Sequence, residues 1–490
     1  MGVHLDFNDE NIQKLFGHEA AEDENDERLK QYFFKTKIYN NFTSNLPLRI
    51  LVGHKGTGKS AMVKFSAFED YENGRLPIFI QPNDVYNINS STSNDFLTSV
   101  REWEEGLKTI IQKKILERLN FHNNNDIQKI KHFGNKIMEF VLETVKNVKD
   151  SIDLDPTQRK LVEQFLNNKK VVVYIDDLDR GWLNKKEDIK RISALLNAIR
   201  DISNENRNVL FKIALRTDVY YAVRTSDEST DKIEGSVIWY SWSNHEILQL
   251  LVKRITTFLN DPIPDIDLES KNQQELSKYL NTTMEHIFKG KGKWSHVPTY
   301  KILMSLIRKR PRDLVKLCTL AARSAYKADR SIITSLDFQN IFEEYSQGRI
   351  QDTINEYRSE LPEIERLLMG MKPNKVEKRA SKGYVYTSAD LYTKISNVLQ
   401  GGEMLFSNRN KASSKELAAF LYKINFLTAR KLSGDGKLHR KYFEESRYIS
   451  GNFADFGFDW EIHPAYRWAL QPDSIESIYD QLEINEITFL

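Results

Sequence analysis

The sequence has almost no cysteine and no long apolar run, and these absences limit where the protein can work. Cys318 is the only cysteine among 490 residues, so a disulfide within the chain is impossible and a reducing compartment is expected. No apolar stretch approaches the roughly 18 residues that suggest a membrane span. The start of the chain, Met1 to Asp6, lacks the basic and then apolar pattern of a leader. We therefore predict a cytoplasmic protein with no membrane partner.

An excess of one charge is also missing. Lys and Arg together number 71 and Asp and Glu 69, which gives a net charge of +2, so any surface for a polyanion has to be local. Basic residues gather between Lys372 and Lys382 and between Lys289 and Lys293. Both groups are typical of solvated linkers or loops, because no regular aromatic pattern accompanies them.

The strongest motif follows the short apolar run 50–52. It reads Gly-His-Lys-Gly-Thr-Gly-Lys-Ser and fits G-x-x-x-x-G-K-[ST] in full. Glycines let backbone N–H groups surround phosphates, Lys59 then reaches the β- and γ-phosphates, and the Ser60 hydroxyl binds Mg²⁺. The pattern predicts a strand, a phosphate loop and a helix whose positive end faces the anion. The residues expected to contact ATP in this loop are Gly53, His54, Lys55, Gly56, Thr57, Gly58, Lys59, Ser60 and Ala61.

A second motif, Asp-Asp-Leu-Asp-Arg, follows the apolar run 171–175, which is typical of a strand buried on both faces. We expect this strand to be the neighbour of the loop strand, so that Asp176 lies at the nucleotide edge of the sheet and binds Mg²⁺ directly or supports a group that does. Asp177 stands where a general base polarises the attacking water, although a solvated loop acid is the alternative. Asp179 and Arg180 form an ion pair in one interpretation and remain separate in the other.

The two motifs together resemble the KAP-type P-loop ATPases, within the wider AAA+ and STAND group of signalling ATPases. Other segments are similar to a bacterial branch of uncharacterised P-loop ATPases, several of which sit in phage-defence gene neighbourhoods. Those segments are Leu215-Arg216-Thr217-Asp218, Trp242-Ser243, Leu250-Leu251, Arg254-Ile255, Lys309-Arg310-Pro311-Arg312-Asp313 and His463-Pro464-Ala465-Tyr466-Arg467. They mark kinship, whereas only the two nucleotide motifs are specific to chemistry.

The resemblance implies roles for two arginines. Arg216 ends the strand predicted over 209–215 and matches the first sensor position, where an arginine near the γ-phosphate separates triphosphate from diphosphate. Its alternative is an ion pair with Asp218 or Asp227. Arg312 follows Pro311 at the start of a helix, which resembles the second sensor of AAA+ relatives, including the origin-recognition ATPases. A purely structural role is its alternative. The catalytic set is thus Lys59, Asp177 and Arg216, with Arg312 binding nucleotide.

The fold class expected is α/β: a parallel P-loop NTPase sheet with a helical insertion, then a helical lid and a winged-helix-like C-terminal domain. We expect an N-terminal helical segment over 1–45, with a helix over 27–42, and an ATPase core over 46–243. The insertion covers about 85–168, with helical periodicity over 94–119, 127–148 and 157–167. The lid covers 244–371, with helices dominating over 244–258 and 266–346, and the charged segment 372–382 separates it from 383–490.

The order of elements beyond 383 is that of a winged-helix module: helices over 388–399 and 413–424, a strand over 426–430 and a turn at 434–436. In nucleic-acid binders the second helix enters the major groove, which here would bring Lys415, Lys423 and Arg430 to phosphates. A structural arm is the alternative. His463 lacks partners at metal-ligand spacing.

These motifs predict an ATPase that uses ATP and Mg²⁺ to drive a conformational or assembly switch, because no second catalytic constellation is present. The resemblance implies a homo-oligomer with a protein effector in antiviral defence. Two alternatives remain open: a DNA-engaging ATPase similar to origin-recognition proteins, and a nucleotide-locked scaffold that recruits a nuclease.

Overall fold

The protein is described from a computed structural model. The described residues are 5–20, 23–86, 88, 95–119, 137–138, 141–142, 145–146, 156–226, 228–379, 383–432, 438–446, 457–471 and 478–479. Two compact units make up the chain, one over Lys35–Tyr240 and the other combining Met1–Phe34 with Ser241–Leu490. We call them the loop unit and the helical unit and describe each by itself. Among the described residues, no helix is both long enough and apolar enough to span a bilayer.

The loop unit is built on a five-stranded sheet with the order β2-β3-β4-β1-β5, in which every pair is parallel. Its strands are β1 (Leu48–Gly53), β2 (Leu76–Ile80), β3 (Val171–Ile175), β4 (Val209–Arg216) and β5 (Val237–Trp239). Nearly all residues of β1, β3 and β4 are buried, as expected for parallel strands covered on both faces. The strands predicted over 50–52, 171–175 and 209–215 are confirmed as β1, β3 and β4, but the expectation that β1 and β3 are neighbours is wrong, since β4 lies between them.

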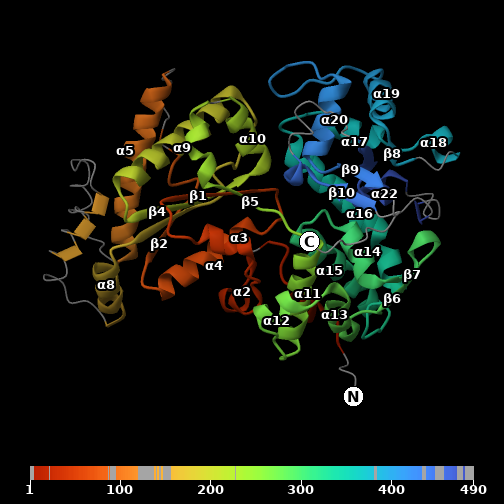
Figure 1. Ribbon diagram of the computed structural model, residues 1–490, viewed down its shortest axis with the longest axis horizontal. Coiled ribbons are helices and arrows are strands. Elements are labelled where there is room, and N and C mark those ends of the chain that lie inside the picture. The colour runs from red at the N-terminus through yellow and green to blue at the C-terminus, as the bar shows by residue number, and fades with distance from the viewer. Residues whose placement is uncertain are drawn as a thin grey trace. The chain divides into compact units, whose positions relative to one another are not determined.

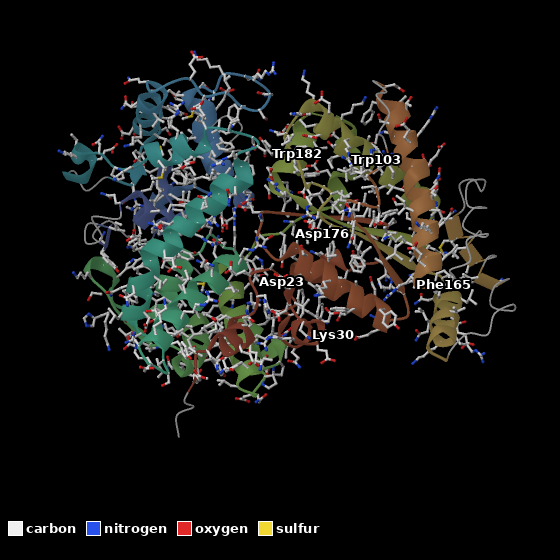
Figure 2. All side chains as sticks on the ribbon, turned by 180° about the vertical axis from the view of Figure 1, so that it is seen from behind. Asp23, Lys30, Trp103, Phe165, Asp176 and Trp182 are labelled. Carbon is white, nitrogen blue, oxygen red and sulfur yellow. The ribbon has the colours of Figure 1, made fainter. Side chains whose placement is uncertain are left out.

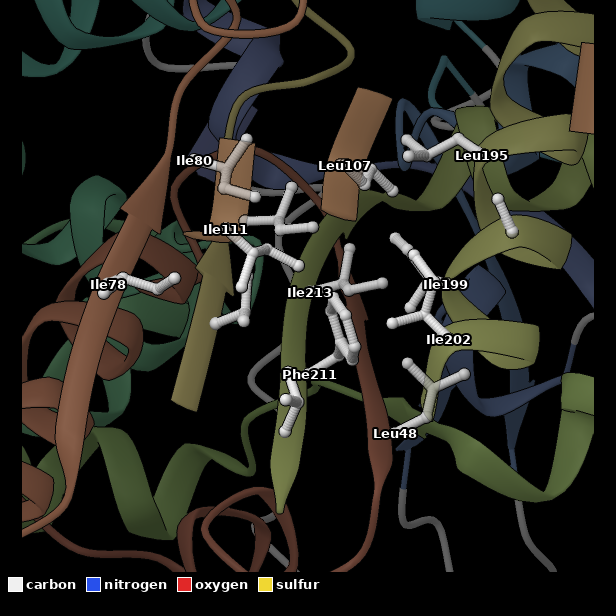
Figure 3. Packing of buried hydrophobic residues seen from close by; sticks show 14 of the residues in the cluster. Leu48, Ile78, Ile80, Leu107, Ile111, Leu195, Ile199, Ile202, Phe211 and Ile213 are labelled. Atoms are coloured by element: carbon white, nitrogen blue, oxygen red, sulfur yellow. The ribbon is translucent and has the colours of Figure 1, made fainter. Parts of the chain in front are cut away.

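Helices cover both faces of this sheet (Figure 1). One face carries α3 (Lys37–Phe42) and α4 (Lys59–Glu72), and the other carries α5 (Phe96–Arg118), α9 (Lys186–Glu205) and α10 (Thr217–Ser226). The core on the second face joins alternate strand residues to the apolar stripes of α5 and α9, and Figure 3 shows Phe211 and Ile213 of β4 against this layer. Helices α5 and α8 (Pro156–Asn168) confirm both ends of the helical insertion, whereas the segment 127–148 lies largely outside the described residues.

The predicted single helix over 27–42 is wrong. Two short helices replace it, α2 (Asp26–Tyr32) and α3, because Phe33 is extended with φ −61° and ψ 125°. The Thr36 side chain then caps the second helix by accepting from the Tyr39 N–H. The chain passes from the helical unit to the loop unit within this break.

The helical unit begins with α1 (Asp9–Phe16), which packs on α11 and α15. Its further helices are α11 (Asn244–Phe258), α12 (Asp265–Ser270), α13 (Gln273–Lys278), α14 (Thr299–Leu306), α15 (Pro311–Lys327), α16 (Ser335–Tyr357), α17 (Ile364–Gly370) and α18 (Lys375–Arg379). Pro311 occupies the first turn of α15, as predicted. Helices dominate 266–346 as predicted. They are interrupted by the antiparallel pair β6 (Ile287–Lys289) and β7 (Ser295–Pro298), where glycines at 290 and 292 break the helical pattern.

The same unit ends in a winged-helix-like module. Its elements are β8 (Val385–Tyr386), α19 (Ser388–Leu399), α20 (Ser414–Lys423), β9 (Leu427–Leu432), β10 (Leu438–Lys441), β11 (Asp459–Ile462) and α22 (Arg467–Leu470). The strands form an antiparallel sheet in the order β10-β9-β11-β8, and α19 packs on α20. This confirms the predicted helix, helix, strand, strand order, while the turn 434–436 lies outside the described residues.

Candidate functional site

The loop between β1 and α4 has the backbone geometry of an anion cradle. Gly56 and Gly58 have φ values of 83° and 94°, in the left-handed region that favours glycine. A Cβ atom on Gly53 would lie 2.9 Å from the Thr57 Oγ1, so the turn is also tight at its start. Helix α4 begins at Lys59 with no side-chain cap and no acidic residue in its first turn. Its first N–H groups are therefore available to a bound phosphate.

Lys59 closes this loop from within. Its Nζ donates to the carbonyl oxygens of Gly53 and His54 at 2.9 Å and 3.1 Å, and the Thr57 hydroxyl donates to the His54 oxygen at 2.8 Å. His54 is buried and Lys55 is exposed. The predicted loop residues thus lie together, with the ammonium group of Lys59 inside the curve of the backbone.

Asp176, labelled in Figure 2, directly follows β3 and is hydrogen-bonded to the Ser60 hydroxyl and to the Asp177 N–H. Burial raises the pKa of Asp176 to about 6, with a contribution from Asp177, against the opposing effects of Ser60 and Lys59. The two motifs meet although their strands are not neighbours, because α4 crosses the sheet face over β4, β3 and β2. A hydroxyl beside a carboxylate is the set of oxygen ligands that suits Mg²⁺, so these residues fit that ion.

Asp177 lies in a strained turn. Its φ is 58°, and its carbonyl oxygen accepts from the Arg180 N–H at 2.9 Å. A non-glycine residue in this region costs on the order of 1 kcal/mol and persists where the surroundings enforce it. The side chain is exposed beside Asp176, which suits a group that has to contact water.

Asp179 connects the ends of β3 and β4. Its buried carboxylate accepts from the Arg216 N–H at 3.0 Å, while Arg180 is exposed. Burial raises the pKa of Asp179, and Arg216 and Lys59 oppose that shift. No local pattern predicts this contact, because the backbone partner comes from a strand 37 positions away.

Arg216 stands beside the loop. It is in register with Gly53 on the adjacent strand, and its guanidinium makes a bidentate pair with Asp218 through Nε at 3.1 Å and Nη2 at 2.7 Å. Of the two partners considered from the sequence, Asp218 is therefore the one in contact, and Asp227 lies outside the described residues.

Arg312 belongs to the helical unit. It is the second residue of α15, and its Nε donates to the backbone carbonyl oxygen of Glu19 at 2.9 Å. The preceding Arg310 is buried, with Nη1 3.7 Å from Glu356 Oε2. These contacts lie within the helical unit.

The cations proposed for the winged-helix-like module are differently placed. Lys423 forms an ion pair with Glu360 and lies over the Phe420 ring, Arg430 is buried, and Lys415 is exposed. His463 makes contacts through both ring nitrogens, since Nδ1 accepts from the Ala465 N–H at 3.1 Å and Nε2 lies 2.9 Å from the Tyr442 hydroxyl. Within the described part of the chain, no group of three or more His, Cys, Asp or Glu side chains forms a metal cluster.

Comparison with known proteins gives local and distant likenesses. Residues 245–354 match the FunZ-associated C-terminal helical domain. The "Putative transposon gamma-delta 80.3 kDa protein" of Escherichia coli (strain K12) is 20% identical, over 96% of this chain and 70% of its own length.

Among solved structures, the Aeropyrum pernix ORC2 protein in ADPNP-ADP complexes is 11% identical, with a TM-score of 0.40 over 89% of this chain and 87% of its own. Drosophila ORC bound to DNA is 10% identical, with a TM-score of 0.31 over 89% and 84%. Likenesses this distant assign no function to the chain, so its fold class rests on its own parallel sheet and on the loop between β1 and α4.

Proposed function

We propose that the loop unit binds ATP with Mg²⁺ and hydrolyses it, and that the cycle drives a conformational or assembly switch. The observation that supports this most is the uncapped start of α4, which has Lys59 inside the loop and the Ser60 hydroxyl bonded to Asp176. An anion site, a cation and an oxygen pair for a metal meet at one edge of the sheet.

Each residue has a role in this proposal. Lys59 exchanges its two carbonyl partners for phosphate oxygens, and Ser60 and Asp176 hold the metal. Asp177 orients a water molecule and takes its proton, while Arg216 contacts the terminal phosphate. Arg312 is the further nucleotide-binding residue that the resemblance implies. ATP itself supplies the bond that is cleaved, and the chain supplies positioning and charge.

The wider role rests on the family resemblance. It supports a bacterial antiviral function for a cytoplasmic homo-oligomer that acts with a protein effector, such as a nuclease. A nucleotide-locked scaffold with negligible turnover differs from this switch in one measurable way. The scaffold keeps a single oligomer size with ADP and with a non-hydrolysable ATP analogue, whereas the switch changes size or shape between them.

Substitution of Lys59 tests the assignment. Lys59→Ala removes the cation inside the loop, and we expect nucleotide affinity measured by isothermal titration to fall by roughly 100-fold or more. Lys113→Ala is the matched control, because this lysine is 53% exposed on α5 and pairs along its own helix with Glu117. Unchanged ATP turnover in Lys59→Ala would contradict the proposal.

A DNA-engaging ATPase is the second candidate, and a basic face on the β9–β10 hairpin supports it. Lys431 and Lys441 both lie over the Phe458 ring, at 5.7 Å and 5.4 Å from its centroid. His439 is in register with Lys431 on the same face. Cations grouped around an aromatic ring suit a nucleic-acid backbone and a stacked base.

Duplex binding as a function of salt tests this candidate. Combined Lys431→Ala and Lys441→Ala is expected to weaken binding and to reduce the slope of log affinity against log salt by about 2. Lys411→Ala, exposed and paired with Glu403, serves as the control. A loss caused instead by Lys415→Ala would indicate that α20 is the contact, and no binding by the wild-type chain would exclude the candidate.

A further inference from the structure

The guanidinium of Arg216 lies where two anions can compete for it. Because Arg216 is in register with Gly53 on adjacent parallel strands, the backbones are separated by about 4.8 Å. Lys59 Nζ is 2.9 Å from the Gly53 oxygen, and the buried Asp179 experiences the charges of both Lys59 and Arg216. The two cations therefore belong to one edge of the sheet, beside the predicted phosphate site.

Asp218 is a strong partner for Arg216 before any ligand arrives. Its carboxylate is 5% exposed and accepts two bonds from the guanidinium, in the fork geometry that favours arginine. It also lies in the first turn of α10, where the helix dipole stabilises negative charge. Departure of Arg216 would leave this buried carboxylate without its main cation.

The backbone of Arg216 is fixed by a hydrogen bond, whereas its side chain can adopt more than one orientation. The bond from its N–H to Asp179 fixes the end of β4 next to the loop. The side chain is 20% exposed, so it is not enclosed by packing. Movement of the guanidinium then needs only rotation about side-chain bonds.

We propose that Asp218 sets how strongly the site prefers triphosphate to diphosphate, because its hold on Arg216 lowers the affinity for triphosphate. This rests on the function proposed above. Asp218 holds Arg216 in the ligand-free protein and with bound diphosphate, and only a terminal γ-phosphate draws the guanidinium away. Triphosphate binding therefore includes the cost of separating Arg216 from Asp218, and diphosphate binding does not. Asp218 is a positioning residue that acts through Arg216.

Affinities for ADP and for a non-hydrolysable ATP analogue, both with Mg²⁺, test this in the full chain. Asp218→Asn removes the competing charge, and we expect the ratio of analogue affinity to ADP affinity to rise roughly threefold to tenfold. Asp218→Glu retains the charge and is expected to keep the wild-type ratio. Asp231→Asn is the matched control. It removes the exposed carboxylate that pairs with Arg224, an arginine that lies on α10 as Asp218 does.

The double variant separates this mechanism from a general effect on α10. In an Arg216→Gln background, Asp218→Asn should not change the ratio, because no guanidinium remains to be released. An unchanged ratio in the single variant, or an equal rise in the Arg216→Gln background, would overturn the inference. A wild-type chain that binds neither nucleotide would instead refute the proposed function, so the two failures differ.

The wild-type chain gives an independent measurement that needs no variant of Asp218. The Nε resonance of Arg216, identified by its absence in Arg216→Gln, should shift when the ATP analogue is added and remain in place with ADP. Equal shifts with both nucleotides would overturn the inference even if Asp218→Asn did not fold.

Discussion

The loop unit and the helical unit both bury carboxylates, but the surroundings shift their pKa values in opposite directions. Burial raises the pKa of Asp176 and of Asp179 at the sheet edge of the loop unit. In the helical unit, arginine partners outweigh burial, and the pKa of Asp313 and of Glu461 is lowered. Buried carboxylates therefore occur in two kinds of surroundings in one chain: with too few cations in the loop unit, and with arginine partners in the helical unit.

The compensated carboxylates give two of the segments that carry the family resemblance, 309–313 and 463–467, a structural role without any reaction. Asp313 accepts from Arg308 at 2.7 Å and 2.9 Å and from Arg349 at 2.7 Å. Arg308 also donates to the Tyr466 hydroxyl at 2.7 Å. The segments 309–313 and 463–467 thus meet in one buried network that joins the helices around α15 to the winged-helix-like module.

Incomplete compensation identifies the carboxylates that are suited to a ligand. An ion pair that satisfies both partners leaves little to gain from an added cation. Asp176 is surrounded by too little positive charge to offset its burial, so a bound metal would improve its environment. The pKa of Asp176 is raised and the pKa of Asp313 and Glu461 is lowered, a difference that the residue types alone do not show.

The largest effect is expected from breaking the structural network. Glu461 accepts from Arg440 at 2.6 Å and 2.9 Å and also pairs with Arg467, and all three side chains are buried. Glu461→Gln would leave two buried arginines without their carboxylate, and we expect the free energy of unfolding to fall by about 3–5 kcal/mol. Urea denaturation measures this. Glu365→Gln, which removes an exposed partner of Arg358, should cost under about 1 kcal/mol.

The same carboxylate predicts an acid transition. Its pKa is lowered to about 2 by the arginines, from an ordinary value of 4.5. The stabilisation is therefore complete above about pH 4.5 and is lost as pH falls towards 2, because the unfolded chain takes up the proton first. Glu461→Gln should lack this part of the acid dependence, and equal pH profiles in the two proteins would contradict the account.

Asp177 offers a large effect of a different kind. Asp177→Asn removes a proton acceptor, and we expect turnover to fall by about 100-fold to 10,000-fold while ATP affinity stays within about twofold. Asparagine tolerates a positive φ, so the turn at 58° should persist. Steady-state kinetics measures turnover, and isothermal titration measures ATP affinity. Asp201→Asn, at an exposed carboxylate on α9, is the control. Retained turnover would indicate that Asp177 is a solvated loop acid.

The sequence predicted those parts of the loop unit that local patterns determine. The loop between β1 and α4, the strand before Asp176 and the start of α15 at Pro311 each depend on a few consecutive residues, and all three elements lie where expected. Helix α11 begins at a Ser243 and Glu246 capping box, which is also a local signal.

Features that depend on distant partners were not predicted correctly. The position of β4 between β1 and β3 follows from packing of the whole sheet, and no local pattern encodes it. Asp179 bonds a backbone amide of another strand, and Lys423 pairs with Glu360, 63 positions away. From the sequence, the chemistry of a charged side chain can be predicted well. Its partner is predicted poorly, because tertiary contacts select the partner.

A smaller effect is expected from the buried base of the loop unit. Lys212 donates to the carbonyl oxygens of Phe42 and Ser44 at 2.6 Å each, and burial lowers its pKa to about 7 against the attraction of Asp70. Between about pH 7 and 10.5 the unfolded chain binds a proton that the folded chain releases, so stability rises with pH in this window. Lys212→Met removes the titration, and the rise in unfolding free energy from pH 7.5 to 9.5 should shrink by about 2 kcal/mol. Identical slopes would show that the two carbonyl partners keep Lys212 charged.

The smallest expected effect tests the comparison of the two units most directly. The same carboxylate-to-amide substitution should change stability in opposite directions at Asp176 and at Glu461. Asp176→Asn replaces a half-buried, poorly compensated carboxylate with a neutral group of the same shape, so the ligand-free chain should gain about 1 kcal/mol in stability. Glu461→Gln makes the same chemical change in the compensated network and should destabilise. Thermal unfolding without Mg²⁺ measures both, and Mg²⁺-dependent ATP binding should weaken only for Asp176→Asn. Destabilisation by both variants would mean that Asp176 is as fully paired as Glu461 and that its pKa shift marks no ligand site.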